Sequence, residues 1–338
     1  MARKSTSKQT AFLVAARITI MSLVFLASCF AQVSVLKYAP KSKVNNGTYA
    51  EISLPFVESD NPGVAWRINE LIYQYRFHRR APKSVNEAAP DFAESSTALE
   101  TSFNVIRNDS KVVSLRCQVF SCGASCASST SYFVFDPTTG RQIKPQDLFT
   151  KEGCASFSKR MMRYWKSVPD QQDPYHDPFQ RRYEGFLEFI SEEFAINDSQ
   201  VVFYLGNGNR HVSYDSLAFK FDSLQNYLND FGKRVLFGRP ANATQPNNLI
   251  GQLFKGTIGK SPVVVILDIF ENHITGFYYY EKYGEHLPFW DGTVNGNQLI
   301  LPVSVQNPEL IKARIGLKSL VGTWSCGEKS LPFSVSLE

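Results

Sequence analysis

Hydrophobic positions along the chain follow different spacings in different regions. A mostly apolar run, interrupted by Thr19 and Ser22, covers residues 18–26. Apolar residues then recur every three or four positions from Val64 to Tyr75, after the turn residue Asn61 and Pro62, which predicts a helix that begins at Pro62. Apolar and polar residues alternate in segments of 103–136, and short β segments separated by Gly or Asn turns follow beyond 263; both patterns predict strands. The chain therefore belongs to the α+β class.

The pattern over residues 47–235 predicts an antiparallel sheet with packed helices. A strand at Tyr49–Phe56 precedes the first helix, and a three-stranded meander ends at Ser131–Asp136. Two helical patterns follow, one marked by Cys154 and Phe157 and the other running from Phe179 to Phe194. The region closes with two strands and a short helix, at Val201–Leu205, Leu217–Phe221 and Asp222–Asp230.

Residues 249–338 are nearly all short β segments separated by turns with Gly or Asn, which predicts a meander that forms a small barrel or a sandwich. Tyr278, Tyr280 and Trp324 either line a ligand cavity or fill the barrel interior, and filling is favoured. The expected strands are Val263–Ile269, Ile274–Lys282, Leu287–Val294, Gln298–Val305, Ala313–Leu320, Gly322–Cys326 and Leu331–Leu337.

The N-terminal residues resemble a secretory signal. Basic residues precede a short apolar run that ends Leu26-Ala27-Ser28-Cys29, so residues 1–29 are interpreted as a signal peptide whose Cys29 is lipidated. Cleavage after Ala31 without lipidation is the alternative, and the run is shorter than the roughly 20 residues of a membrane-spanning helix. We expect residues 30–46 to form a polar tether and residues 236–248 to link the two folded parts.

Export would remove the basic signal from the mature chain and would place the cysteines in an oxidising compartment. Four of the 36 basic residues lie in the signal, which leaves 32 against 31 acidic ones and gives no electrostatic case for nucleic acid. In an oxidising compartment the short spacing of Cys122 and Cys126 predicts a disulfide across a loop. Cys117 lies on the apolar face of its predicted strand, and Cys154 lies on the apolar face of its predicted helix. Cys326 has no evident partner. The spacing of Cys117, Cys122 and Cys126 fits no zinc site.

No motif of known catalytic mechanism is present: the histidines are isolated, and neither His-Glu-x-x-His nor Gly-x-Ser-x-Gly occurs. We therefore predict neither an enzyme nor a cofactor. Asp136, Asp147 and Glu152 lie close in sequence, and such carboxylates could act in acid–base catalysis on a glycan. Turn capping is the simpler role for them. The polar loop at 206–214, with Arg210, His211 and Tyr214, is the preferred binding edge, against an ordinary exposed hairpin.

The order of elements and several turns resemble the RsiV-like extracytoplasmic domain, over most of residues 48–230. The matching segments are Ile68-Asn69-Glu70-Leu71-Ile72, Cys122-Gly123-Ala124-Ser125-Cys126, Tyr132-Phe133-Val134-Phe135-Asp136 and Asp147-Leu148-Phe149. Members of this family include anti-sigma factors that sense lysozyme and domains found beside peptidoglycan deacetylases. Here only 17 residues precede the hydrophobic run, too few for a sigma-binding domain. The region after 249 is similar to a β module of exported bacterial proteins.

The resemblance and the leader together imply an exported cell-envelope lipoprotein, facing the periplasm or the cell surface, or otherwise secreted to the periplasm. The expected partners are a membrane, through the lipid on Cys29, and either lysozyme or peptidoglycan. A binding or sensing role is preferred. The alternatives are a cell-wall glycan hydrolase that uses Asp/Glu of the first domain, and a structural envelope protein without a ligand.

Overall fold

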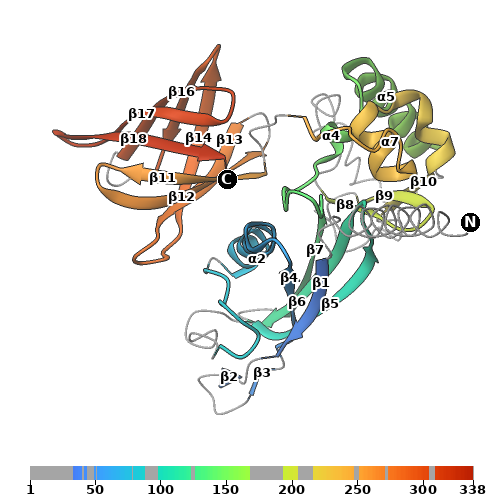
Figure 1. Ribbon diagram of the computed structural model, residues 1–338, viewed down its shortest axis with the longest axis horizontal. Helices are drawn as coiled ribbons and strands as arrows, with labels where there is room; N and C mark the ends of the chain where they lie inside the picture. The colour runs from blue at the N-terminus through green and yellow to red at the C-terminus, as the bar shows by residue number, and fades with distance from the viewer. Residues whose placement is uncertain are drawn as a thin grey trace, which may run out of the picture.

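The computed structural model shows three connected regions: a β-barrel, a central sheet with one long helix, and a lobe of helices around a small sheet (Figure 1). The residues described are 33–39, 42–43, 49–50, 52–77, 79–87, 98–122, 126–167, 193–204, 216–246, 251–270, 273–303 and 309–337. None of the described helices combines the length and the apolar character needed to cross a membrane.

The central region begins earlier in the chain than the sequence predicts. Strand β1 (Val33–Tyr38) pairs antiparallel with β4 (Leu54–Ser59), and the short β2 (Ser42–Lys43) pairs with β3 (Tyr49–Ala50). The expected tether over 30–46 is therefore wrong for 33–38. Val33 and Tyr38 are buried in the core, and β4 supplies the hydrogen-bonding partner that a tether would lack. The expected strand Tyr49–Phe56 is divided between β3 and β4.

Helix α2 (Pro62–Phe77) begins where the sequence predicts and buries the expected face. Val64, Ile68 and Leu71 are almost fully excluded from solvent. The Asn69 side chain accepts a hydrogen bond from the Val57 N–H at 2.7 Å and donates one to its carbonyl at 2.8 Å, which joins α2 to β4. The predicted meander is also present, as β5 (Ala98–Asn108), β6 (Val113–Cys122) and β7 (Cys126–Phe135).

The helical lobe surrounds a three-stranded sheet in the order β10-β9-β8. Phe157, Phe203 and Phe219 meet in its core, with ring centroids 4.9 to 6.0 Å apart. The elements of the lobe are α4 (Pro145–Leu148), α5 (Lys151–Ser167), β8 (Glu193–Ile196), β9 (Gln200–Tyr204), β10 (Ser216–Lys220), the 3-10 helix η1 (Phe221–Tyr227) and α7 (Asp230–Phe237).

One helix prediction in this lobe is wrong at its end, and another is confirmed only in part. Phe194, expected at the end of a helix, lies in β8, where its ring stacks on Phe203 across the strand pair. The rest of that expected helix, 179–192, lies outside the described residues. The short helix expected at Asp222–Asp230 is a 3-10 turn followed by α7, which the sequence analysis placed partly in the linker. Asn229 caps α7, because its side chain accepts a hydrogen bond from the Gly232 N–H at 2.8 Å.

The C-terminal region is a barrel, not a sandwich: eight antiparallel strands follow one another in chain order, and β11 pairs with β18 to close the sheet. The sequence pattern does not predict β11. The expected strand Ala313–Leu320 is wrong at its centre, because it joins the end of β16 to the start of β17 across the turn at 316–318. The strands are β11 (Gln252–Ile258), β12 (Ser261–Phe270), β13 (His273–Tyr280), β14 (Leu287–Asn295), β15 (Gln298–Pro302), β16 (Glu309–Ile315), β17 (Ser319–Cys326) and β18 (Lys329–Leu337).

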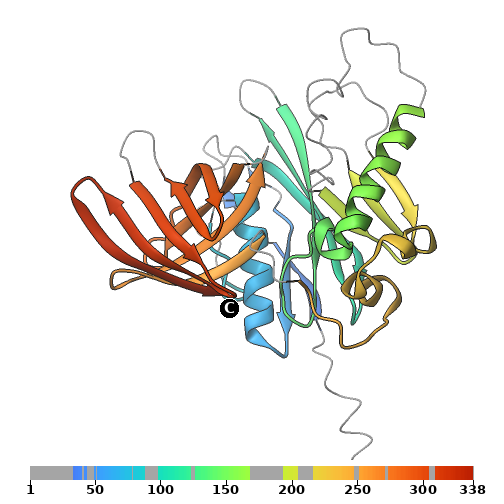
Figure 2. The same cartoon turned by 90° about the horizontal axis from the view of Figure 1, so that it is seen from above.

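The barrel and the central region share a hydrophobic core. Helix α2 lies between them in both views (Figures 1 and 2). Alternate residues of β12 and β13 face the barrel interior, while Val264, Ile266 and Phe277 face outward and belong to the core that contains α2. Tyr279 donates a hydrogen bond to the buried Glu70 of α2 at 2.5 Å. The apolar run Val263–Leu267 is continuous because both of its faces are buried.

Candidate functional site

One face of the β5–β6–β7 sheet is open to solvent. The opposite face packs Leu115, Cys117 and Phe133 into the core with α2. On the open face, Ser102 pairs with Gln118, which pairs with Thr130, so their side chains lie in one row across the three strands. We call this surface the polar sheet face, and it comprises Ser102, Asn104, Arg116, Gln118, Phe120, Ser128 and Thr130.

The sequence alternation explains why the two faces differ. In the middle of β6, buried and partly exposed residues alternate, with Leu115 and Cys117 turned to the core and Arg116 and Gln118 turned away from it. Ser102, Asn104 and Ser128 are exposed, whereas Gln118 and Thr130 are half-buried. The result is a surface made mainly of hydroxyl and amide groups, together with Arg116 and Phe120, on a sheet whose other face packs into the core.

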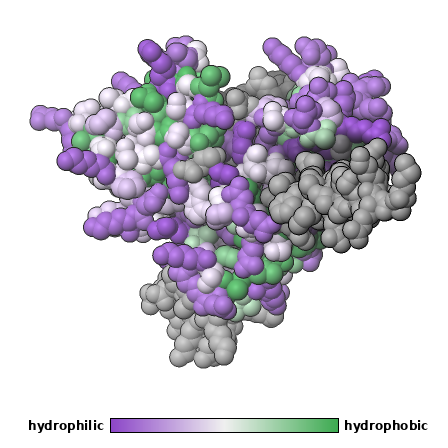
Figure 3. Space-filling view, viewed as in Figure 1, coloured by the Kyte–Doolittle hydropathy of each residue, from purple (hydrophilic) through white to green (hydrophobic). Residues whose placement is uncertain are grey.

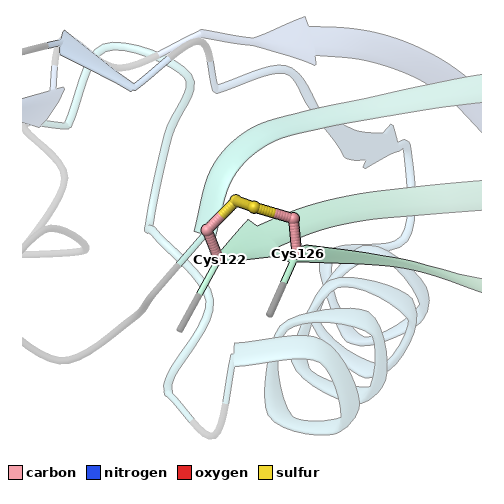
Figure 4. Close-up of a disulfide and its surroundings, with 2 residues drawn as sticks. All are labelled: Cys122 and Cys126. Atoms are coloured by element: carbon pink, nitrogen blue, oxygen red, sulfur yellow. A yellow bond between two sulfur atoms is a disulfide. The ribbon is translucent and has the colours of Figure 1, made fainter. Parts of the chain in front are cut away.

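The disulfide expected between Cys122 and Cys126 is present at the tip of the β6–β7 hairpin (Figure 4). These two cysteines face each other as the last pair of the ladder, with their Cα atoms 4.0 Å apart. The other described cysteines, Cys117, Cys154 and Cys326, are free thiols. Burial raises the pKa of the Cys117 thiol to about 12, so this cysteine stays protonated and packs as an apolar residue.

Two stacked tyrosines adjoin the polar sheet face at its other end. The rings of Tyr132, from β7, and Tyr204, from β9, lie 3.6 Å apart and nearly parallel. Tyr204 also pairs with Ser216, so the described chain leaves β9 and returns to β10 at this point. The predicted binding loop with Arg210, His211 and Tyr214 lies between these two residues, outside those that the structure describes. Cys29 lies outside them as well.

The predicted aromatic residues of the second region meet at one end of the barrel. Tyr278 and Trp324 belong to the barrel core, and the half-buried Tyr280 ring lies 5.7 Å from that of Tyr278. Glu309, which the sequence analysis did not single out, accepts hydrogen bonds from the Tyr278 hydroxyl at 2.8 Å and the Trp324 indole at 3.3 Å. Burial, and then Glu309, raise the pKa of Tyr278, so its hydroxyl remains a neutral donor.

The carboxylates weighed for acid–base chemistry do not converge on an open cleft. Asp136 is buried, pairs with Arg234 at 2.7 Å and accepts hydrogen bonds from the Thr138 N–H and hydroxyl. Asp147 is buried too. It accepts hydrogen bonds from the Lys144 N–H at 2.9 Å and the Gln245 amide at 2.8 Å.

Both buried carboxylates therefore hold turns together, whereas Glu152 is exposed on the first turn of α5. Within the described part of the chain, no three His, Cys, Asp or Glu side chains gather as metal ligands would.

Comparison with known proteins shows similarity only at the level of structure. The sequence matches no family profile and has no significant match among curated proteins. A DUF3298 family protein from Pseudomonas aeruginosa PAO1 aligns with a TM-score of 0.39 and 13% identity, over 60% of this chain and 95% of its own. A DUF3298 family member from Bacteroides fragilis NCTC 9343 aligns with a TM-score of 0.37 and 11% identity, over 59% and 94%. At these TM-scores the similarity carries no argument about function.

Proposed function

We propose that the protein is an exported cell-envelope binding protein whose polar sheet face contacts the glycan of the cell wall. The observation that carries this proposal is the geometry of that face. Three neighbouring strands present Ser, Thr, Asn and Gln side chains in register, with Ser102, Asn104 and Ser128 exposed and the Gln and Thr side chains half-buried. Hydroxyl and amide groups both donate and accept hydrogen bonds, as a sugar surface requires.

The charge of this face favours a glycan over lysozyme. Lysozyme is strongly basic, so a surface that binds it is expected to be acidic. The face has one guanidinium, that of Arg116, and Glu100 at its margin beside Phe120. Its neutral polar character suits an uncharged sugar chain. The stacked Tyr132 and Tyr204 rings at one end add an aromatic surface next to which the predicted binding loop begins.

The Cys122–Cys126 disulfide supports the proposed export, because disulfides persist in oxidising compartments and are rare in the cytoplasm. We propose that the signal directs the chain out of the cell and that a lipid on Cys29 anchors it to a membrane. A Cys29→Ser variant should leave the membrane fraction and lose the mass of the acyl chains. Unchanged fractionation of this variant would contradict the lipid anchor and leave the glycan proposal standing.

The glycan proposal is tested by binding of the purified protein to insoluble peptidoglycan and to soluble muropeptide fragments. The Asn104→Ala/Gln118→Ala variant should bind at least ten times more weakly. The matched control is Asn295→Ala/Gln298→Ala, which removes the same two residue types from an exposed part of the barrel and should bind like the parent protein.

Three results would contradict the proposal: equal losses in both variants, no binding to either glycan, or capture of c-type lysozyme by the same face. Release of soluble products from peptidoglycan would contradict a pure binding role.

A further inference from the structure

A second surface feature lies in the helical lobe, on the side of α5 that faces the end of β10. Here a hollow of about 630 Å³ is lined by Arg160 and Arg163 of α5, by Ala218, Phe219 and Lys220 of β10, and by Ser223 of η1. Three of its six lining residues are cationic, and none is acidic. The described surface around α5 and α7 is also mostly hydrophilic in the view of Figure 3.

Within the described part of the chain, none of these three cations forms an ion pair with an acidic residue. Among the described residues, the ion pairs within 4.0 Å involve Arg107, Lys111, Lys233 and Arg234 but not Arg160, Arg163 or Lys220. Like charges that share a hollow repel one another unless an anion lies between them. The hollow therefore has a charge that an anionic ligand would balance.

Arg160 is held in place, so the hollow has one fixed and two adaptable cations. Its guanidinium donates a hydrogen bond to the Ser223 carbonyl at 2.8 Å and lies 5.4 Å from the centre of the Phe219 ring. The Ser223 hydroxyl donates to the Lys220 carbonyl at 2.8 Å, which stabilises the turn from β10 into η1. Arg163 and Lys220 are exposed and free to move towards a ligand.

We propose that this hollow binds a phosphate group. A guanidinium presents paired N–H donors that match two phosphate oxygens, and the ammonium of a lysine adds a point charge. Two arginines and one lysine around a hollow of this size suit a phosphate ester or diester that is carried on a larger molecule. The site is separate from the polar sheet face and does not depend on the glycan proposal.

The test measures binding of inorganic phosphate, inorganic pyrophosphate and glycerol phosphate to the purified full chain by titration calorimetry. Vesicles of phosphatidylglycerol, compared with vesicles of phosphatidylcholine, distinguish a lipid headgroup from a soluble phosphate. The Arg163→Gln/Lys220→Gln variant should weaken binding at least tenfold. Both substituted side chains are exposed, so the fold should be retained.

The matched control is Lys151→Gln/Lys159→Gln, which removes two exposed cations from the same helix and leaves the hollow intact. It should change binding less than twofold. Binding of the soluble phosphates alone, or of these and the phosphatidylglycerol vesicles, supports the site and identifies the source of the phosphate. Equal weakening in both variants, or no binding of any phosphate probe, overturns it.

Discussion

The barrel and the regions that precede it are stabilised in different ways. Every barrel strand is hydrogen-bonded on both sides, and its interior is filled by side chains such as Phe254, Phe289 and Phe333. In the earlier regions, the described residues form four separate sheets of two or three strands. These sheets are joined by packing and by side-chain hydrogen bonds, such as that from the Ile196 N–H to Ser114 at 3.2 Å.

This difference indicates where binding surfaces can form. A closed barrel has no free strand edges, and here its filled interior is used for packing. Small open sheets leave faces and edges exposed, and both surfaces that we propose for binding, the polar sheet face and the hollow beside β10, lie on them. The barrel instead supports the central region through α2, with which it shares a core.

The largest expected effect on stability comes from a cavity in the barrel core. Phe333 is completely buried, so Phe333→Ala should lower the free energy of unfolding by about 3 to 5 kcal/mol. Phe120, on the polar sheet face, is 36% exposed, and Phe120→Ala should cost under about 1 kcal/mol. Urea unfolding followed by circular dichroism measures both. Similar losses in the two variants would contradict the division between a stabilising barrel and an exposed sheet.

The next largest effect concerns the contact between the barrel and the central region. The buried Glu70 accepts hydrogen bonds from the Tyr279 hydroxyl at 2.5 Å, the Gln74 amide at 2.8 Å and the Ala81 N–H at 3.2 Å. Tyr279→Phe removes a hydrogen bond to a buried carboxylate and should cost about 1.5 to 3 kcal/mol. A double-mutant cycle with Glu70→Gln should show an interaction energy of at least about 0.5 kcal/mol. If the losses of stability in the two single variants simply add, the Tyr279–Glu70 hydrogen bond does not couple the barrel to the central region.

Elements with a strong local pattern could be predicted from the sequence, and elements defined by distant partners could not. Helix α2 follows from its spacing and from Pro62, and most barrel strands follow from alternation between Gly and Asn turns. Strand β1 is recognisable only through its pairing with β4, sixteen or more residues away. Strand β11 has the same dependence, because β18 at the far end of the chain completes its hydrogen bonding.

The candidate surfaces show the same limit. The disulfide was predictable because Cys122 and Cys126 end the two strands of one hairpin. The polar sheet face was not, since alternation shows that Gln118 faces away from the core but not that its surroundings stay open. The basic hollow combines Arg163 of α5 with Ala218 of β10, which are 55 residues apart in the chain. Glu309 was missed because its partners, Tyr278 and Trp324, lie on other strands.

A smaller effect should follow from removal of the disulfide. It closes a loop only a few residues long, and the chain-entropy estimate for such a loop is at most about 2 kcal/mol. The Cys122→Ser/Cys126→Ser variant should therefore unfold at a slightly lower urea concentration. Its amide hydrogens at the β6–β7 tip should exchange faster. Protection in the barrel should be unchanged. Faster exchange throughout the barrel would show that the hairpin stabilises more than its own sheet.

The smallest effect concerns Tyr38 of β1 at alkaline pH. Burial, and then the nearby Glu87, raise the pKa of this tyrosine to about 12, above its usual value of about 10. The unfolded chain therefore releases the proton first, and the stability that the neutral hydroxyl contributes is complete below pH 10 and is lost as the pH rises towards 12. Tyr38→Phe should flatten this alkaline loss, although it also removes the hydrogen bond to the Glu87 carbonyl at 2.9 Å. Urea midpoints measured at neutral pH and above pH 10 separate the two contributions. An unchanged alkaline slope in the variant would place the proton-linked loss in other tyrosines, such as Tyr278 of the barrel, whose pKa burial also raises.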